Sequence, residues 1–261
     1  MSSTEPRGAE LESEVDSAPF DLPGSGRAAA LCLHGLTGTP YEVRSLGEAL
    51  SAAGIRALGP ALPGHNDSPE RLARVQHDEW LEAARMSLRE LRREHEVVFG
   101  VGLSMGGLVT LALASEGAYD AAVVVGVPLR LAQPLASLIP LLSRFVGSVP
   151  KKAGSDIHDP AARARHPGYR VMPLAAVRQL QRLQRRVRAS LGSVEVPLLV
   201  AHGARDRTAN PADAHEIIKK VASSQCECLI LENSAHVVPV DCDRADLAAA
   251  SVRFLAPFAR C

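Results

Sequence analysis

The residues with the clearest potential for chemistry form a Gly-x-Ser-x-Gly pentapeptide around Ser104. A serine hydroxyl becomes an effective nucleophile once a neighbouring base removes its proton. An apolar, β-branched run from Val97 precedes the pentapeptide, and good helix formers follow it over Leu108–Ala114. This order predicts a nucleophile elbow, a sharp strand-to-helix turn that forces the serine into a strained conformation at a helix N-terminus. Glycines suit positions 102 and 106 because a Cβ there would collide with the neighbouring strand or helix. The alternative is an ordinary turn serine.

A nucleophilic serine needs a base and a carboxylate that orients the base, and the chain offers both in the order serine, acid, histidine. Two apolar runs that are typical of strands end in titratable side chains. The first continues into His202-Gly203-Ala204-Arg205-Asp206, and the second into Leu231–His236. Ligands bind at the carboxyl edge of open α/β sheets, where both groups would meet. We therefore predict that Asp206 orients His236 and that His236 activates Ser104.

Other titratable residues have different interpretations. Asp213 and Asp241 also lie near predicted strand ends and remain alternatives for the acid. A carboxylate at Asp213 would suit the start of a helix, and Asp241 could cap the final helix. We interpret three further histidines as residues that organise loops: His34, His65 and His202.

Alternation of apolar runs with amphipathic stretches predicts a doubly wound, mostly parallel α/β sheet that positions these side chains. Strands are expected at 28–33, 55–58, 97 to the serine, 121–127, 197–201 and 227–231. Helices are expected around 46–50 with an end at Gly54, and at 78–93, 108–114, 212–221 and 243–258. We expect a single domain over 17–261, preceded by a flexible acidic tail over 1–16.

The alternation stops over about 129–193, where helical patterns occur without a convincing strand. We expect this stretch to be a helical cap inserted over the carboxyl edge of the sheet. Its apolar side chains either pack the core or line an acyl pocket: Leu135, Leu138, Ile139, Leu142, Phe145, Val146, Leu180, Leu183, Val187 and Leu191. Three arginines on another face of the second helix are interpreted as a solvated surface: Arg178, Arg182 and Arg186.

Several motifs together resemble a known family. They are Leu33–Pro40, Pro63–His65, Gly102–Gly107, His202–Asp206 and Ser234–His236. From about residue 28 onward the chain is similar to small bacterial carboxylesterases of the α/β-hydrolase family, which are related to the monoacylglycerol lipases. The resemblance implies that the backbone N–H groups of Leu36 and Met105 form an oxyanion hole. Each preorganised donor of this kind stabilises the transition state by about 3–4 kcal/mol.

Composition narrows the classes of partner. The chain has 261 residues, 46% of them hydrophobic, and its 29 basic side chains balance 29 acidic ones. A net charge of zero gives no reason to expect nucleic acid or an anionic membrane as a partner. We see no run long enough for a membrane span and no secretion signal, so we expect no stable membrane insertion and a cytoplasmic location. The cysteines lack paired metal spacing and are interpreted as reduced thiols: Cys32, Cys226, Cys228, Cys242 and Cys261.

These patterns predict a serine hydrolase that cleaves small carboxylic esters with short-to-medium acyl chains through an acyl-enzyme. No metal or organic cofactor is needed for this chemistry. A monoacylglycerol lipase or a thioesterase would use the same residues, because the cap sets the acyl length and the leaving group. A non-catalytic binding module is the alternative from another class. Such a module would have no reason to keep Ser104, Asp206 and His236 together.

Overall fold

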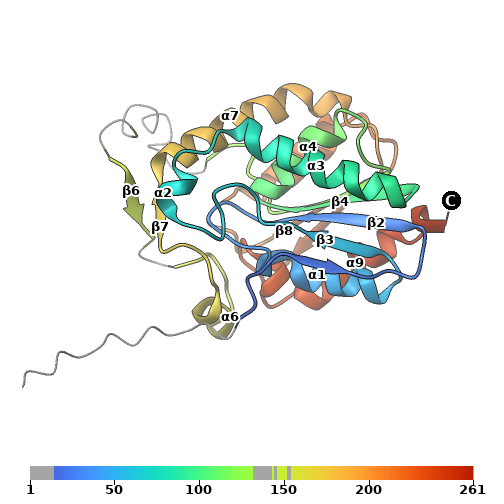
Figure 1. The fold of residues 1–261 in the computed structure, drawn as a ribbon, viewed down its shortest axis with the longest axis horizontal. Helices are drawn as coiled ribbons and strands as arrows, with labels where there is room; N and C mark the ends of the chain where they lie inside the picture. The colour runs from blue at the N-terminus through green and yellow to red at the C-terminus, as the bar shows by residue number, and fades with distance from the viewer. Residues whose placement is uncertain (1–14, 132–142, 144–145, 152–153, 261) are drawn as a thin grey trace, which may run out of the picture.

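Seven strands form one sheet in the part of the chain that the structure, a computed structural model, describes: residues 15–131, 143, 146–151 and 154–260 (Figure 1). The strand order is β1-β3-β2-β4-β5-β8-β9, and all neighbours are parallel except β1 and β3. The strands are β1 (Phe20–Leu22), β2 (Ala28–Leu33), β3 (Arg56–Gly59), β4 (Val97–Leu103), β5 (Ala121–Val125), β8 (Leu198–Gly203) and β9 (Cys226–Leu231). The four central strands are buried throughout and apolar except for His202 in β8, because helices cover both faces of a parallel sheet.

Helices lie on the two faces of this sheet, with α3, α4 and α7 on one side and α1 and α9 on the other (Figure 1). Their bounds are α1 (Tyr41–Ala52), α3 (His77–Glu94), α4 (Met105–Ala114), α7 (Leu174–Ser190), α8 (Ala212–Lys220) and α9 (Arg244–Leu255). Each face has its own apolar cluster, which contains Trp80 on the α3 side and Phe99 on the α1 side. The α/β architecture is the one predicted, and the expected strands and helices of the sheet differ from these bounds by only a few residues.

The segment between β5 and β8 departs from the prediction of a stretch without strands. It contains a two-stranded antiparallel ribbon of β6 (Ser148–Pro150) and β7 (Val171–Pro173). Three-residue strands with a proline at one end are too short to show a period of two, so the expectation of helices alone was wrong. The short helix α6 (Pro160–Arg165) lies between the two strands. We call residues 146–173, as far as they are described, the inserted segment.

Helix α7 packs with the sheet rather than standing apart from it. Its apolar stripe of Leu180, Leu183 and Val187 joins the cluster formed by α3 and α4. On another face of α7, Arg186 forms ion pairs with Asp78 of α3 and with Glu116, which follows α4. The first predicted cap stripe, Leu135, Leu138, Ile139, Leu142 and Phe145, lies outside the described residues.

Three further features lie between Asp16 and Leu72. The edge strand β1 was not predicted from the sequence, because it has three residues and a charged centre at Asp21. Of the expected tail, residues 1–14 lie outside the described part of the chain, and Asp16 forms an ion pair with Arg44 at 2.9 Å. A four-residue helix, α2 (Pro69–Leu72), begins at Ser68, whose side chain accepts a hydrogen bond from the Arg71 amide.

Candidate active site

Ser104 lies in the turn between β4 and α4, where the backbone has the strained geometry that the sequence predicts. Its φ of 54° falls in the left-handed region, which a residue with a side chain rarely adopts. A Cβ at Gly102 would lie 2.4 Å from the Gly106 carbonyl oxygen, and one at Gly106 would lie 2.1 Å from Leu33 O. Glycine is therefore required at both positions, and the Ser104 amide donates to Val125 O at 2.8 Å. This packing holds the hydroxyl at the carboxyl edge of the sheet.

The structure brings Ser104, His236 and Asp206 into one hydrogen-bonded chain. His236 Nε2 lies 2.9 Å from Ser104 Oγ, and His236 Nδ1 lies 2.7 Å from Asp206 Oδ2. The other oxygen of Asp206 accepts hydrogen bonds from the amides of Thr208 and Ala209, both at 2.8 Å. These amides orient the carboxylate toward His236. The arrangement is the one in which a histidine removes the proton of a serine while a carboxylate orients the ring.

Burial and charge shape the protonation of the pair. Burial alone would lower the pKa of His236, but the adjacent carboxylate of Asp206 raises that pKa above its ordinary value. Burial would likewise raise the pKa of Asp206, yet His236, the nearby His202 and the Ala209 amide hold it well below its usual range. His202 Nε2 lies 2.9 Å from Asp206 Oδ2, the same carboxylate oxygen that faces His236. Asp206 is therefore ionised whenever His236 titrates.

The two alternative acids have other contacts. Asp213 accepts a hydrogen bond from the Leu129 amide at 2.8 Å, and burial raises its pKa. Asp241 uses its two oxygens to bind four amides, those of His158, Asp159, Ala235 and Cys242. It fastens the loop that carries His236 to the inserted segment, and neither carboxylate contacts the imidazole. Geometry therefore favours Asp206 over both.

The turn after β2 approaches the serine closely. A Cβ on Gly35 would lie 3.5 Å from Ser104 Cβ, so the backbone itself borders the nucleophile. In the described residues, neither the Leu36 N–H nor the Met105 N–H donates a hydrogen bond. Both groups flank the serine and have capacity for a ligand oxygen. Leu36 follows Gly35 in this turn and Met105 follows Ser104, and the role of their amides as oxyanion donors stays a prediction.

Histidines next to this turn organise loops, as predicted. His34 Nε2 accepts a hydrogen bond from the Leu62 amide at 3.1 Å, which leaves the ring proton on Nδ1, 2.9 Å from Gly35 O. Burial lowers the pKa of His34 and lowers that of His65 to about 3, so both rings are neutral near pH 7. Their centroids lie 4.8 Å apart in an edge-to-face contact. The pair ties the turn after β2 to the loop that follows β3.

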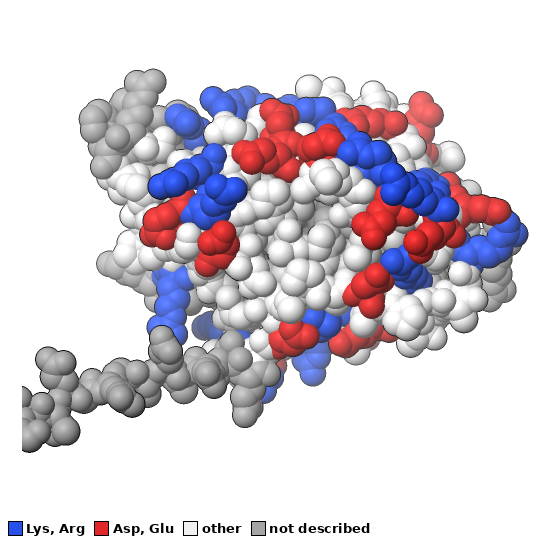
Figure 2. Space-filling view, in the orientation of Figure 1, with Lys and Arg blue, Asp and Glu red and all other residues white. Residues whose placement is uncertain are grey.

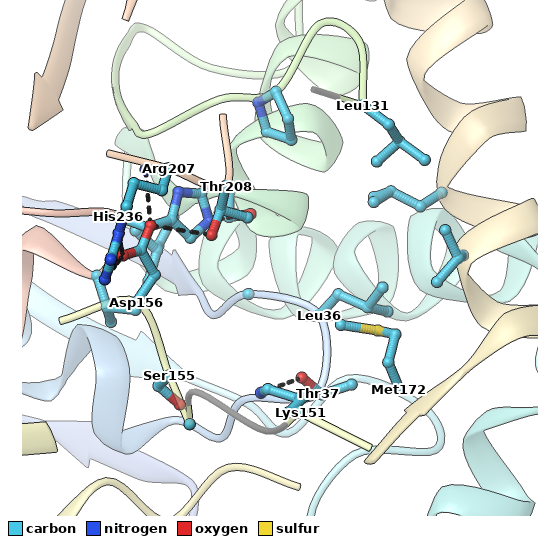
Figure 3. A pocket seen from close by; sticks show the side chains of 18 of the residues that line it. Leu36, Thr37, Leu131, Lys151, Ser155, Asp156, Met172, Arg207, Thr208 and His236 are labelled. Carbon is cyan, nitrogen blue, oxygen red and sulfur yellow. Dashed lines mark hydrogen bonds and ion pairs between the residues drawn. The ribbon is translucent and has the colours of Figure 1, made fainter. Parts of the chain in front are cut away.

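A cavity of about 390 Å³ lies over Ser104 and His236, between the sheet and the inserted segment. Figure 3 shows Leu36, Leu131 and Met172 on one side of it and Asp156, Arg207 and Thr208 gathered around His236 on the other. Further apolar lining comes from Val149, Leu174, Val177 and Leu180, among others. Polar lining near the turn comes from Thr37 and Lys151, whose side chains hydrogen-bond at 3.1 Å. The cavity therefore has an apolar side and a polar side.

Asp156 is a site residue that sequence reasoning missed. Its carbonyl oxygen accepts hydrogen bonds from the amides of His236 and Val237, at 3.0 and 3.2 Å. Its carboxylate accepts from the Arg207 amide at 2.8 Å and from Thr208 Oγ1 at 3.1 Å. One residue of the inserted segment thus binds the loops that carry both His236 and Asp206. No periodicity marks this position, and its partners lie more than fifty residues away, so the sequence holds no local signal for it.

Comparison with known proteins places this geometry in a family. The profile of the family described as "Serine aminopeptidase, S33" matches residues 24–243. The chain belongs to this family of α/β-hydrolases. Relatives of the S33 chain are named for ester hydrolysis. It is 30% identical over 241 residues to a thermostable monoacylglycerol lipase of Bacillus sp. (strain H-257), a match that covers 90% of this chain and 93% of the lipase. It is 26% identical over 237 residues to a carboxylesterase of Bacillus subtilis (strain 168), covering 88% and 92%.

Solved structures give the same result for the fold of this S33 hydrolase. One, reported for the metagenome-derived lipolytic enzymes LipS and LipT, superposes with a TM-score of 0.87 at 28% identity and covers 92% of this chain and 98% of that one. The monoacylglycerol lipase of Paleococcus ferrophilus gives a TM-score of 0.80 at 19% identity, with coverage of 92% and 98%, which bears on the fold alone. Family and relatives together identify the protein as a serine ester hydrolase.

The described ranges contain neither a bilayer-spanning helix nor a cluster of metal-ligating side chains. No helix there is long and apolar enough to span a bilayer. No group of three His, Cys, Asp or Glu side chains in those ranges is arranged to hold a metal ion. Cys32 is buried, Cys226 is half-buried, and Cys228 and Cys242 are exposed, all as free thiols. Cys261 lies outside the described residues.

Proposed function

We propose that the protein hydrolyses carboxylic esters through an acyl-enzyme on Ser104, with His236 as the base and Asp206 as the orienting acid. The observation that carries this proposal is the hydrogen-bonded chain from Ser104 Oγ through His236 to Asp206, which opens into a cavity with an apolar side. The sequence similarity to a protein named monoacylglycerol lipase and to one named carboxylesterase supports it. An ordinary surface serine would have neither a buried imidazole beside it nor a carboxylate that orients this imidazole.

The chemistry follows from the positions of these atoms. Ser104 Oγ attacks the ester carbonyl carbon and passes its proton to His236 Nε2, while the charge of Asp206 stabilises the imidazolium. The carbonyl oxygen becomes negative and accepts hydrogen bonds from the Leu36 and Met105 amides. When the tetrahedral intermediate collapses, the C–O bond to the alcohol breaks and His236 returns the proton to the departing oxygen. A water molecule then repeats the sequence on the acyl-serine and releases the carboxylic acid.

The cavity favours esters with a short-to-medium acyl chain. Its apolar side, lined by Leu131, Met172 and Val177, fits hydrocarbon, and each buried methylene contributes about 0.8 kcal/mol. Its polar side, with Asp156 and Thr208, fits a hydroxylated alcohol. This two-sided lining makes a monoacylglycerol the second candidate substrate, as the name of the Bacillus relative suggests. An acyl thioester would use the same nucleophile and is the further alternative.

Replacement of the serine tests the proposal directly. Ser104→Ala removes the attacking oxygen, and we expect ester turnover to fall by about 10⁶-fold while the circular dichroism spectrum stays unchanged. A fluorophosphonate probe should label the wild-type chain and leave the variant unlabelled. Turnover of the variant within tenfold of wild type would remove Ser104 from the mechanism.

The substrate class is read from a panel on the wild-type enzyme. p-Nitrophenyl esters from acetate to dodecanoate measure acyl preference, and monoacylglycerols and acyl thioesters of equal chain length measure leaving-group preference. We expect kcat/KM to rise with chain length until the apolar side is full and then to fall. A steady fall from acetate onward would show that the apolar lining serves packing alone.

A further inference from the structure

A buried carboxylate lies directly behind the turn that borders Ser104. Glu42, in the first turn of α1, is only 4% exposed. Its Oε2 atom accepts a hydrogen bond from the Gly35 amide at 2.7 Å. The next amide along the chain belongs to Leu36, one of the two proposed oxyanion donors. A hydrogen bond that fixes the Gly35 amide therefore also restricts the direction in which the Leu36 N–H points.

His166 of the inserted segment holds the other oxygen of this carboxylate. Its Nε2 atom lies 2.9 Å from Glu42 Oε1, and both side chains are almost completely buried. The Gly168 amide donates to Nδ1 at 3.3 Å, and Ser155 Oγ lies 2.8 Å from the same nitrogen. With Nδ1 accepting, the ring proton is on Nε2 and points at Glu42. A neutral imidazole is thus sufficient for the contact.

The turn after β2 packs tightly against the Glu42 carboxylate. A Cβ at Gly38 would lie 2.1 Å from Glu42 Oε2, so the backbone leaves room for the acidic group and for nothing more. Burial would raise the pKa of Glu42, but His166 and the Gly35 amide, with a contribution from the nearby His34, lower it to about 2. The group is therefore ionised at any pH at which His236 can act as a base. An ionised acceptor makes stronger hydrogen bonds to amides than a neutral one.

The inserted segment contacts the same turn at Thr37. The Tyr169 amide donates to Thr37 O at 2.9 Å, and Lys151 Nζ donates to Thr37 Oγ1 at 3.1 Å. Thr37 itself has a left-handed φ of 63°, a conformation that needs support from its surroundings. The inserted segment therefore contacts Thr37, which follows Leu36, directly. It supports Gly35, which precedes Leu36, through the contact of His166 with Glu42.

We propose that Glu42 is a positioning residue for the oxyanion turn and that His166 holds it in place, so that the inserted segment sets the rate of turnover. This inference rests on the proposed function, because it needs an oxyanion formed at Ser104. The role differs from structural packing alone in one respect. It acts on the charge that develops in the transition state, and therefore on kcat more than on ground-state binding.

Three variants test the proposal on the full-length enzyme with a p-nitrophenyl ester. Glu42→Leu removes the acceptor of the Gly35 amide, and we expect kcat to fall by about 10- to 100-fold with KM within threefold of wild type. That is part of the 10²–10³-fold loss seen when an oxyanion donor is removed outright. Glu42→Gln keeps one oxygen for the Gly35 amide, so its kcat should lie between those of wild type and Glu42→Leu. His166→Leu leaves Glu42 without its partner and should also lose kcat rather than KM.

A second measurement distinguishes positioning from a loss of folded protein. An alkyl trifluoromethyl ketone adds to the serine and places an oxyanion in the hole, whereas the matching secondary alcohol binds without one. The inhibition constant of the ketone should weaken in parallel with kcat/KM across the three variants, and that of the alcohol should stay within threefold. Equal weakening of both ligands, or a loss confined to KM, would overturn the proposal even if one variant folds poorly.

Asp120 provides the matched control. Its carboxylate also accepts a backbone hydrogen bond at 2.7 Å, from the Val98 amide, and also contacts a basic side chain, Arg92 at 2.8 Å. It lies at the opposite end of β4 from Ser104. Asp120→Leu should leave kcat within twofold of wild type, and an equal loss in both Leu variants would contradict the specific role of Glu42. Fluorophosphonate labelling of the wild type, and its absence in Ser104→Ala, test the proposed function separately.

Discussion

The imidazole of His236 takes its acid–base properties from the carboxylate behind it. Asp206 raises the pKa of His236 above its ordinary value against the effect of burial. Because the base must be neutral to accept the serine proton, kcat/KM should rise with pH through a midpoint above the ordinary histidine value of about 6.5 and then level off. Kinetics measured from pH 5 to 9 provide the test, and a maximum near pH 4 would contradict a histidine base.

Removing the charge of Asp206 should change both the rate and this midpoint. Asp206→Asn favours the wrong tautomer of His236, and turnover should fall by roughly 10⁴-fold. The residual activity should have a lower midpoint, because burial then lowers the pKa of His236 against only the smaller effects of Asp156 and Glu42. Asp213→Asn is the control, since it alters a buried carboxylate that does not contact the ring. A larger loss of turnover from Asp213→Asn than from Asp206→Asn would show that Asp206 is not the orienting acid.

The candidate site shows which residues a sequence can reveal. Ser104, Asp206 and His236 were predictable because each follows an apolar run, and carboxyl ends of parallel strands meet at one edge. Asp156, Glu42 and His166 were not predictable. Their contacts join α1, the inserted segment and the loops of the sheet, and no spacing along the chain reports a contact across more than a hundred residues, such as that of Glu42 with His166.

At the scale of elements, α7 is expected to contribute to global stability. Leu183 is completely buried in the cluster that α3 and α4 share with the sheet. Leu183→Ala should lower the free energy of unfolding by about 2–5 kcal/mol, through lost burial and the cavity left behind. Urea unfolding followed by fluorescence of Trp80, the single tryptophan, measures this change. A change below about 0.5 kcal/mol, the range of surface substitutions, would show that α7 is a detachable part of a cap.

Strand β7 is expected to influence acyl preference. Met172 lies in this strand and lines the apolar side of the cavity. Met172→Asp introduces a charge that hydrocarbon would have to desolvate, so the rise of kcat/KM with chain length should flatten while acetate is still hydrolysed. Met86→Asp, at an exposed position of α3, is the matched control and should keep the wild-type profile. An unchanged profile in Met172→Asp would place the acyl chain elsewhere.

The lengths of the strands explain why only part of the fold was predictable from the sequence. The long apolar runs of β2, β4, β5 and β8 identify buried parallel strands with little ambiguity. The short β1, β6 and β7 are held by neighbours rather than by their own pattern, as in the pairing of β6 with β7. Periodicity requires several residues to be visible, so three-residue strands escape it.

At the scale of the whole molecule, basic and acidic side chains lie next to one another around the edge of the face drawn in Figure 2, and its centre is mostly uncharged. Arg85, for example, pairs with Glu116, and Arg130 pairs with Glu216. Such exposed pairs contribute little individually, typically about 0–1 kcal/mol. The buried carboxylates around the site should affect the dependence of stability on pH more than these exposed ion pairs do.

The folded protein should lose stability in acid in a defined window. The pKa of Glu42 is about 2 in the folded state against an ordinary 4.5, so its contribution is fully present above pH 4.5 and disappears as the pH falls toward 2. The shift corresponds to about 3 kcal/mol. The pKa values of Asp206, Asp241 and Asp243 are lowered too, which adds loss in the same direction.

Urea unfolding of wild type and Glu42→Gln between pH 2.5 and 7 measures this effect. The wild type should lose stability steeply below about pH 4.5, and the variant should start lower and decline less over that window. Asp213, whose pKa is raised by burial, acts in the opposite sense and reduces the total slope. Parallel curves for the two proteins would mean that folding does not lower the pKa of Glu42.

The contacts of Asp156 and His166 also bear on how substrate range can be redesigned. A chimera that exchanges a whole insertion between related hydrolases treats the insertion as an independent module. Here an exchange of residues 146–173 would separate Glu42 from His166 and the His236 loop from the Asp156 carbonyl oxygen. A foreign module would therefore bring its own selectivity at the cost of the recipient's rate. New selectivity in this protein is better sought by substituting single side chains that face the cavity, with the backbone of the segment kept as a fixed part of the catalyst.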